Sequence, residues 1–278
     1  MADFGPPVSG SLRAYGTQKA DTFHGGDYFD RFWGHGGADR FFGYANYDTF
    51  YGGDGPDLAF GGSDRDDLYG GTGKDRLNGG GGGDFIKGEE GHDRLKGGRD
   101  IDQLYGGPGN DIILGGPGND NIFGDDAAKW HRGNDLIRGG GGDDRIHGGN
   151  GRDRIFGGKG DDHINDDRGN DRINPGKGDD TIIGGSGKDT FVFKNPDGRN
   201  YGHKEISGYD PTEGDRIVLI GADVSSRRQL ERTYEVEEID EGHIYGLKIS
   251  FGKGGSLMFV NVSRGQDVEA LLDSISFA

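Results

Sequence analysis

The sequence has little of what a conventional globular core needs. It contains no cysteine, so neither a disulfide nor a thiolate zinc site can form. Only 30% of its 278 residues are hydrophobic, and its formal net charge is -17. Such a composition excludes a large apolar core and is typical of a disordered chain, unless a regular pattern orders the backbone.

Signals for membrane insertion and for Sec export are also missing. The chain has no run of about 18 apolar residues, so we expect no transmembrane segment. At its amino end no basic segment precedes an apolar one, so we expect no Sec signal peptide. The acidic balance argues against nucleic acid as a partner, because phosphate neutralisation needs a clustered basic face. It favours cations instead.

Glycine is abundant, with 61 residues, and it recurs in phase with aspartate. The stretch from Gly106 to Phe123, GGPGNDIILGGPGNDNIF, consists of two nearly identical nonapeptides. With aspartate as position six, the series runs every nine residues from Asp21 to Asp120 and, after six extra residues, from Asp135 to Asp189. A fixed period of this kind predicts a repeat architecture rather than disorder.

A second column of the repeat is apolar. Position eight, two residues after each aspartate, carries a large apolar residue in every cycle except at Ala59. In an extended segment that side chain points to one face and its two neighbours point to the other. Glycine provides the positive φ that tight turns between such segments need. The pattern therefore predicts short strands with a thin apolar interior.

These residues match the sequence GGxGxDxUx, where U is large and apolar, and the chain resembles the RTX (repeats-in-toxin, hemolysin-type) calcium-binding family over residues 16–193. The resemblance implies an all-β fold, a parallel β-roll in which two nonapeptides make one coil. We expect a short lead at 1–15, the roll at 16–193, and a small β-rich cap with one short helix at 194–278.

The aspartates of such a roll would stack and repel one another unless a cation neutralises them. Calcium takes six to eight oxygen ligands, and the resemblance implies structural ions held between turns that lie eighteen residues apart. Lys19 and Tyr28 replace the position-four glycine, so we expect the first two turns to be poor in metal. The predicted calcium ligands are Asp39, Asp48, Asp57, Asp66, Asp75, Asp84, Asp93, Asp102, Asp111, Asp120, Asp135, Asp144, Asp153, Asp162, Asp171, Asp180 and Asp189.

The composition changes after the last repeat. Residues 205–219 resemble the segment that follows the repeats in serralysin-type proteases, where it begins a carboxy-terminal β-cap. Two alternating segments around a GKGG turn predict a hairpin, and the spacing from Val268 to Ile275 predicts a helix. The final DSISFA is similar to uncleaved type I secretion signals. We therefore expect a secreted protein that uses the type I secretion apparatus and no Sec signal.

No catalytic motif of the HExxH or GxSxG type occurs, and carboxylate pairs such as Asp179 and Asp180 fall in the turn phase. We therefore expect a non-enzymatic protein.

Position nine points outward and repeats an aromatic residue, which predicts a ligand face for extracellular polysaccharide or a cell surface. Its members are Trp33, Tyr51, Tyr69, Tyr105 and Phe123, with Lys87 between the third and the fourth. A column of arginines at position seven, which includes Arg40, Arg76, Arg94, Arg154 and Arg172, would suit an anionic polymer better.

Other interpretations stay open. The protein could instead act on membranes, as small membrane-active RTX proteins do, or be the non-catalytic carboxy-terminal module of an RTX protease, lipase or epimerase. The aromatic column could pack against the cap or a second subunit. The inserted segment with Trp130 and His131 is either a tolerated insertion or a contact loop.

Overall fold

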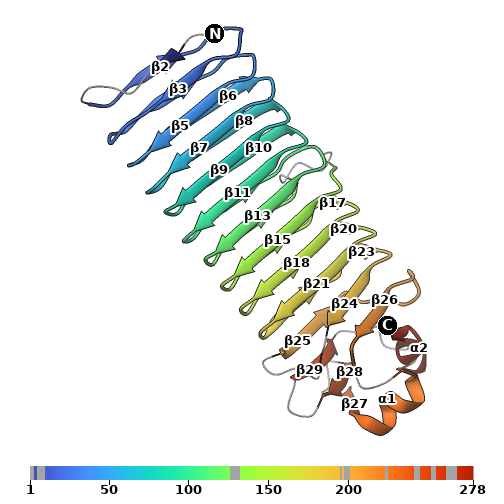
Figure 1. The fold of residues 1–278 in the computed structure, drawn as a ribbon. Helices are drawn as coiled ribbons and strands as arrows, with labels where there is room; N and C mark the ends of the chain where they lie inside the picture. The colour runs from blue at the N-terminus through green and yellow to red at the C-terminus, as the bar shows by residue number, and fades with distance from the viewer. Residues whose placement is uncertain are drawn as a thin grey trace. The chain divides into compact units, whose positions relative to one another are not determined.

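The computed structural model in Figure 1 describes residues 3–4, 10–125, 132–194, 196, 201–222, 225–240, 245–251, 255–260 and 268–277. The chain divides into two compact units, Met1–Gly141 and Gly142–Ala278. Within the described ranges the fold is almost entirely β, with two short helices, and it forms the predicted parallel β-roll. None of those helices is long and apolar enough to cross a bilayer.

In the first unit, consecutive strands alternate between two parallel sheets. The order of one sheet is β1 (Asp3–Phe4), β3 (Thr22–His24), β5 (Arg40–Tyr44), β7 (Leu58–Gly62), β9 (Arg76–Gly81), β11 (Arg94–Arg99), β13 (Ile112–Pro117) and β15 (Leu136–Gly141). The order of the other is β2 (Arg13–Tyr15), β4 (Arg31–Trp33), β6 (Thr49–Asp54), β8 (Asp67–Gly73), β10 (Phe85–Gly91), β12 (Gln103–Tyr105) and β14 (Asn121–Phe123). Between β2 and β14 most neighbouring strands pair in register eighteen residues apart, as Leu68 pairs with Ile86, whereas β13 and β15 pair 24 residues apart across the insertion.

The second unit continues the same alternation and then departs from it. One sheet orders β18 (Arg154–Lys159), β21 (Arg172–Lys177), β24 (Thr190–Lys194), β26 (Arg216–Ile220) and β30 (Ile275–Phe277). Another orders β16 (Arg145–His147), β19 (His163–Asn165), β22 (Asp180–Ile183), β25 (Gly202–Ser207), β29 (Gly255–Val260), β28 (Tyr245–Ser250) and β27 (Glu235–Asp240). A small third sheet consists of β17 (Asn150–Gly151), β20 (Arg168–Gly169) and β23 (Ser186–Gly187).

The position-eight column forms the interior of both units, as predicted. Every member from Phe23 to Phe191 is buried, including Ala59. At the amino-terminal end the phenylalanines stack across the interior, with ring centroids of Phe23 and Phe32 5.3 Å apart. Ala14 occupies the same position one cycle before the predicted roll begins and is also buried. A single apolar column thus supplies the interior where a conventional core is missing.

The turns require glycine because the coils approach each other closely. A Cβ atom on Gly55 would lie 1.7 Å from the carbonyl oxygen of Gly37, and the φ angle of Gly55 is 121°. Where other residues replace the position-four glycine, Asn46, Asp64 and Asp100 have φ of 69°, 72° and 74°, as their tolerance of this region allows. Lys19 and Tyr28 do not have positive φ, so the backbone of the first two turns differs from that of the later turns at this position.

The carboxy-terminal part contains the predicted hairpin, since β28 and β29 pair antiparallel with Ile249 opposite Leu257. It also contains a helix that the sequence pattern did not indicate, α1 (Arg227–Thr233), whose first turn is capped by Ser226. The predicted helix through Ile275 is too long. Helix α2 (Val268–Asp273) ends earlier, because Ile275 pairs with Ile217 in the sheet and is buried there.

Strands β25 and β26 pair in parallel with β22 and β24, so both sheets of the roll extend past residue 193. The domain boundaries at residues 15 and 193 stay predictions.

Candidate calcium sites in the turns

The position-six aspartates are buried in the turns and are held by the backbone of the neighbouring coil. The backbone N–H of Asp21 donates to Oδ1 of Asp39 at 2.7 Å, and that of Asp93 donates to Oδ1 of Asp111 at 2.8 Å. The donor and the acceptor lie eighteen residues apart, which confirms the predicted spacing of turns on one side. Each aspartate therefore has one oxygen fixed by the fold.

The six-residue insertion does not disturb this row. Asp111 donates its backbone N–H to Oδ1 of Asp135 at 2.8 Å, across a separation of 24 residues. The insertion is thus absorbed within one turn, and the aspartates on either side keep their register. Trp130 and His131, for which a contact role was considered, lie outside the described residues.

The second carboxylate oxygen has no protein partner in most regular turns. Oδ2 is buried and accepts no hydrogen bond in Asp39, Asp48, Asp57, Asp66, Asp75, Asp84, Asp93, Asp102, Asp111, Asp162 and Asp171. The remaining predicted ligands, Asp120, Asp135, Asp144, Asp153, Asp180 and Asp189, are buried at the same position of their turns. A buried carboxylate oxygen without a donor is strongly unfavourable unless a cation contacts it.

Carbonyl oxygens of the next coil converge on these oxygens. A Cβ atom on the position-one glycine Gly34 would lie 2.1 Å from Oδ2 of Asp39 and 2.3 Å from the carbonyl oxygen of Gly52. The same arrangement repeats at Gly52, with Oδ2 of Asp57 and the carbonyl of Gly70. Glycine at position one leaves room for this oxygen cluster. Carboxylate and carbonyl oxygens are the donors that calcium prefers.

The electrostatics also require a cation. Burial is the main cause that raises the pKa of Asp48 and of Asp111 to about 8; neighbouring carboxylates act in the same direction, and a backbone hydrogen bond opposes them. At neutral pH the charged form of these side chains is therefore the less populated one, and a nearby positive charge would favour it. The turns fit calcium, which would supply that charge and join successive coils, while the aspartates and glycine carbonyls would hold it.

The first two turns satisfy their aspartates without metal. Oδ2 of Asp30 accepts the backbone N–H of Gly26 at 2.8 Å, and Oδ1 accepts that of Leu12 at 2.7 Å. Oδ2 of Asp21 accepts the hydroxyl of Thr17 at 2.8 Å. Fewer carboxylate oxygens are therefore left for a cation in the amino-terminal turns, and their low metal content stays a prediction.

Comparison with known protein families decides the nature of the repeat. The model of the RTX calcium-binding nonapeptide repeat matches residues 15–50, 51–86, 69–104, 87–122, 132–164 and 156–191, which is more than half of the chain. The chain belongs to the RTX repeat family. Calcium is therefore the cofactor of these turns, and its role is structural.

Two solved RTX-containing proteins are similar. The AlgE6R3 subunit of the Azotobacter vinelandii mannuronan C5-epimerase is 28% identical, with 50% of this chain and 80% of that chain covered and a TM-score of 0.34. The extracellular lipase LipA from Serratia marcescens is 16% identical, with 84% of this chain and 40% of the lipase covered and a TM-score of 0.38. No curated protein matches the RTX chain.

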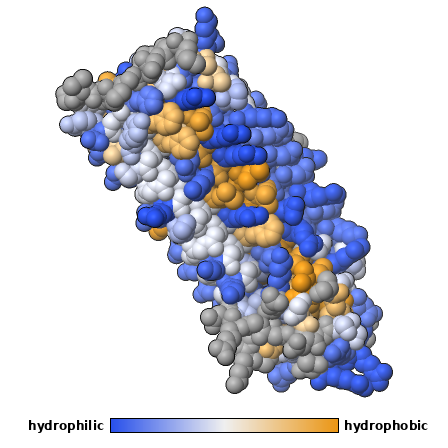
Figure 2. Space-filling model, viewed as in Figure 1, coloured by the Kyte–Doolittle hydropathy of each residue, from blue (hydrophilic) through white to orange (hydrophobic). Residues whose placement is uncertain are grey.

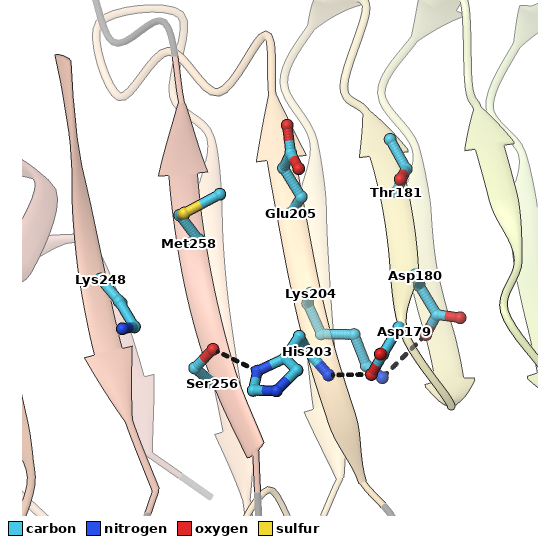
Figure 3. A pocket seen from close by; sticks show the side chains of 9 residues that line it. All are labelled: Asp179, Asp180, Thr181, His203, Lys204, Glu205, Lys248, Ser256 and Met258. Atoms are coloured by element: carbon cyan, nitrogen blue, oxygen red, sulfur yellow. Dashed lines mark hydrogen bonds and ion pairs between the residues drawn. The ribbon is translucent and has the colours of Figure 1, made fainter. Parts of the chain in front are cut away.

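One late turn of the RTX roll contains a protein cation, which the sequence pattern did not reveal. The Lys204 ammonium lies 2.9 Å from Oδ2 of Asp180, and both side chains are fully buried (Figure 3). It also donates to the carbonyl oxygen of Tyr201 at 2.6 Å and to that of Gly178. A carboxylate and carbonyl oxygens thus surround an ammonium here. A sequence signal for this buried cation exists, because Lys204 stands at an inward position of its strand, two residues before the buried Ile206.

Two further acidic residues belong to the turns. Asp215 accepts the backbone N–H of Asp189 at 2.8 Å and so continues the row into the segment assigned to the cap. The sequence DPTEGDRIV at 210–218 places Asp215 and Ile217 at positions six and eight of a further repeat. This repeat was not recognised because Asp215 follows Asp189 by 26 residues instead of eighteen. Asp166 stands at position one of its turn, where most cycles have glycine, and its carboxylate lies near those of Asp171 and Asp189.

Residues of β22, β25, β28 and β29 line a cavity of about 300 Å³ beside the buried lysine (Figure 3). In it, Nδ1 of His203 lies 2.8 Å from Oγ of Ser256. The described contacts of His203 place no carboxylate on its ring, so the pair lacks the third member of a Ser-His-Asp arrangement.

The predicted aromatic column is continuous, and it is longer than expected. Trp33, Tyr51 and Tyr69 stack at centroid distances of 5.7 Å and 4.9 Å, and Tyr105 and Phe123 stack at 4.8 Å. We refer to the complete set as the aromatic ladder: Tyr15, Trp33, Tyr51, Tyr69, Phe85, Tyr105 and Phe123.

Two members of the ladder were not predicted. Phe85 fills the gap at Lys87, with its ring 5.6 Å from Tyr69 and 5.5 Å from Tyr105. The column of position-nine residues did not include Phe85, because it stands at position seven. Tyr15 stacks on Trp33 at 4.8 Å and precedes the predicted roll. Most of the rings are nearly parallel, so they cover one another's faces.

The position-seven arginines are exposed, as predicted. In the first unit Leu58 separates Arg40 from Arg76 in register, whereas Arg76 and Arg94 are direct neighbours. In the second unit Arg154 pairs directly with Arg172. The arginine column is therefore interrupted, while the aromatic ladder is not.

Proposed function

We propose that this RTX protein is a secreted, non-catalytic module that folds on calcium and binds extracellular polysaccharide along the aromatic ladder. Its export would use the type I secretion apparatus without a Sec signal. The observation that carries the proposal is the uninterrupted ladder of seven rings on one sheet of the first unit.

The ladder offers a repeating surface of suitable spacing. Its ring centroids are separated by between 4.8 Å and 5.7 Å, close to the spacing of neighbouring strands, so the ladder presents a regular series of contacts to an extended polymer. Because neighbouring rings cover each other's faces, a glycan chain would contact ring edges and tyrosine hydroxyls. Such contacts repeat along the chain and add up through multivalency.

Apolar exposure is concentrated in the same unit. Two ladder residues, Tyr15 and Tyr51, are among the exposed large hydrophobic side chains of the described residues, and the others also belong to the first unit, some of them on strands β5, β7 and β13 of the other sheet: Tyr28, Phe29, Tyr44, Phe60, Ile101 and Leu114. Figure 2 shows apolar residues gathered on one face between hydrophilic ones. Exposed apolar patches on water-soluble surfaces commonly mark contacts with a partner.

Calcium would change both the fold and the charge. The formal net charge of -17 repels acidic polymers, and about nine bound calcium ions would offset it. Little calcium in the cytosol would keep the repeats unfolded for export, and millimolar calcium outside would fold them. Binding to a surface would then follow only after export.

The test is retention of the chain on immobilised polysaccharides in millimolar calcium. Replacing Tyr51, Tyr69 and Tyr105 together by Ser should abolish retention while leaving the calcium-induced circular dichroism spectrum unchanged. The matched control replaces Arg40, Arg76 and Arg94 by Ser and should retain binding to neutral glycans.

Other results would redirect the proposal. If the tyrosine variant still binds and the arginine variant does not, the exposed arginine column is the binding face and the ligand is an anionic polymer. If the tyrosine variant fails to fold, the ladder is structural. Calcium-dependent leakage from liposomes without retention on any glycan would favour the membrane-active alternative.

A further inference from the structure

Asp166 occupies a position that is glycine in both neighbouring coils of its row, where Gly148 precedes it and Gly184 follows it. A Cβ atom on Gly148 would lie 3.0 Å from Oδ2 of Asp153 and 2.9 Å from the carbonyl oxygen of Asp166. A side chain at position one is therefore directed toward the oxygen-lined space of the turn. At Asp166 that side chain carries another carboxylate.

The carboxylate of Asp166 is fully buried, and neither of its oxygens accepts a hydrogen bond. Its backbone is held in place, because its N–H donates to the carbonyl oxygen of Ile183 at 3.2 Å. The position-six aspartates differ in this respect, since each uses Oδ1 to accept a backbone N–H. Asp166 therefore has two buried carboxylate oxygens that could bind a cation, whereas a position-six aspartate of a regular turn has one.

Two position-six carboxylates complete the cluster. One carboxylate oxygen from each of Asp166, Asp171 and Asp189 lies within 4.8 Å of the others. Oδ1 of Asp171 accepts the backbone N–H of Asp153 at 2.7 Å, and its Oδ2 is buried without a hydrogen bond. Oδ1 of Asp189 accepts the backbone N–H of Asp171 at 2.8 Å. The fold thus fixes two members through their Oδ1 atoms.

The surrounding charges are negative. Two further carboxylates, those of Asp215 and Asp167, add to the repulsion at Asp166. The described contacts of Asp166 include no lysine or arginine, in contrast to the pairing of Asp180 with Lys204. Three buried carboxylates at this separation are strongly unfavourable as anions unless a proton or a cation neutralises them, and their oxygens are the ligands that calcium prefers.

We propose that Asp166, Asp171 and Asp189 form a three-carboxylate calcium site that binds its ion more tightly than the regular turns and fills before them. Calcium affinity rises with the number of charged ligands and with the rigidity of the site. The regular turns combine two position-six carboxylates with carbonyl oxygens, whereas this site adds a third carboxylate. We expect its dissociation constant to be about tenfold lower than those of the other turns.

The experiment is a calcium titration of the full chain in competition with a chromophoric chelator, which resolves the tightest class of sites. Two variants are compared with the wild type, Asp166→Gly and Asp166→Asn. The first restores the residue that both neighbouring coils carry, and the second preserves the shape of the side chain. Each should lose one tightly bound ion per chain, while the circular dichroism spectrum in saturating calcium stays that of the wild type.

The control is Asp161→Asn, which removes the same charge from an exposed carboxylate in a turn of the other row. It should keep the tightest ion. If both Asp166 variants also keep it, or if Asp161→Asn loses it equally, the proposal is overturned. Should the glycine variant fail to fold, the asparagine variant decides between the outcomes. None of these results depends on polysaccharide binding.

Discussion

The regular turns of the first unit and the late turns of the second unit neutralise their buried aspartates in different ways. At Asp57 and Asp75 in the first unit, Oδ2 has no protein partner, and the turns fit calcium. In the second unit, Lys204 contacts Oδ2 of Asp180, while Asp166 adds a carboxylate beside Asp171. The same backbone repeat thus accommodates a calcium ion, a lysine ammonium or an additional carboxylate.

This difference shows what the turn requires. The Lys204 ammonium contacts a carboxylate and two carbonyl oxygens, the same kinds of donor that converge beside Gly34. Burial lowers the pKa of Lys204, although the Asp180 carboxylate opposes this shift. The turn therefore needs positive charge at that place, and calcium meets the need wherever the chain does not. The two regions should consequently respond differently to calcium.

The largest effect should follow calcium removal. With chelator present, we expect the chain to lose most of its β signal, because the buried carboxylates of successive coils repel one another once the cation is gone. Millimolar calcium should restore the signal cooperatively. Circular dichroism during a calcium titration measures this, and a spectrum indifferent to chelator would contradict the calcium-dependent roll.

The next largest effect concerns the internal cation. Lys204→Met should destabilise the calcium-saturated protein by about 3–5 kcal/mol, because methionine fills the space of the lysine side chain without its charge, which keeps calcium out and leaves the Asp180 carboxylate buried without a cation. Urea unfolding in saturating calcium measures the change. Lys248→Met, which alters a more exposed lysine of the neighbouring cavity, is the control and should change little. Equal losses in both variants would remove the special role of Lys204.

A smaller effect should separate the middle of the roll from its amino end. Asp111→Ala should raise the calcium midpoint of folding several-fold, since it removes a bridging carboxylate between regular coils and interrupts the stack. Asp30→Ala should shift the midpoint less, because backbone N–H groups already satisfy both oxygens of Asp30. Equal shifts would show that the first turns bind calcium as the others do.

The smallest effect concerns the aromatic ladder. Phe85→Leu should lower the free energy of unfolding by about 0.5–1.5 kcal/mol, because the ring connects Tyr69 with Tyr105. Ile101→Ala, at an exposed apolar residue outside the ladder, should lower it by less than about 0.5 kcal/mol. The measurement is urea unfolding in saturating calcium. A neutral Phe85→Leu would mean that the stack contributes little to stability.

The sequence predicted much of the roll because the repeat is local. Each nonapeptide carries its own turn glycines, its aspartate and its inward apolar residue, so the period alone indicates which residues are buried. The buried column from Phe23 to Phe191 and the eighteen-residue spacing of the aspartates follow this prediction. Departures from the repeat could be located in the same way, as for Asn46 and Asp64 with positive φ.

The remaining features depend on contacts that no period marks. Lys204 reaches Asp180 from 24 residues away, and Asp215 joins the row 26 residues after Asp189. Phe85 enters the ladder from position seven, since its ring reaches its neighbours across the strands. Helix α2 ends before Ile275 because sheet pairing outweighs a short helical pattern.

The sequence by itself determined the family, the parallel coils and the carboxylates that need a cation, because every nonapeptide carries the glycines, the aspartate and the apolar residue on which these properties depend. Only the tertiary structure decided which carboxylates find protein partners and which do not. That outcome depends on the distance between side chains of different coils. Asp30 and Asp180 stand at the same position of the repeat, yet the fold gives the first backbone donors and the second an ammonium, and it places Asp166, at position one of its turn, beside two further carboxylates.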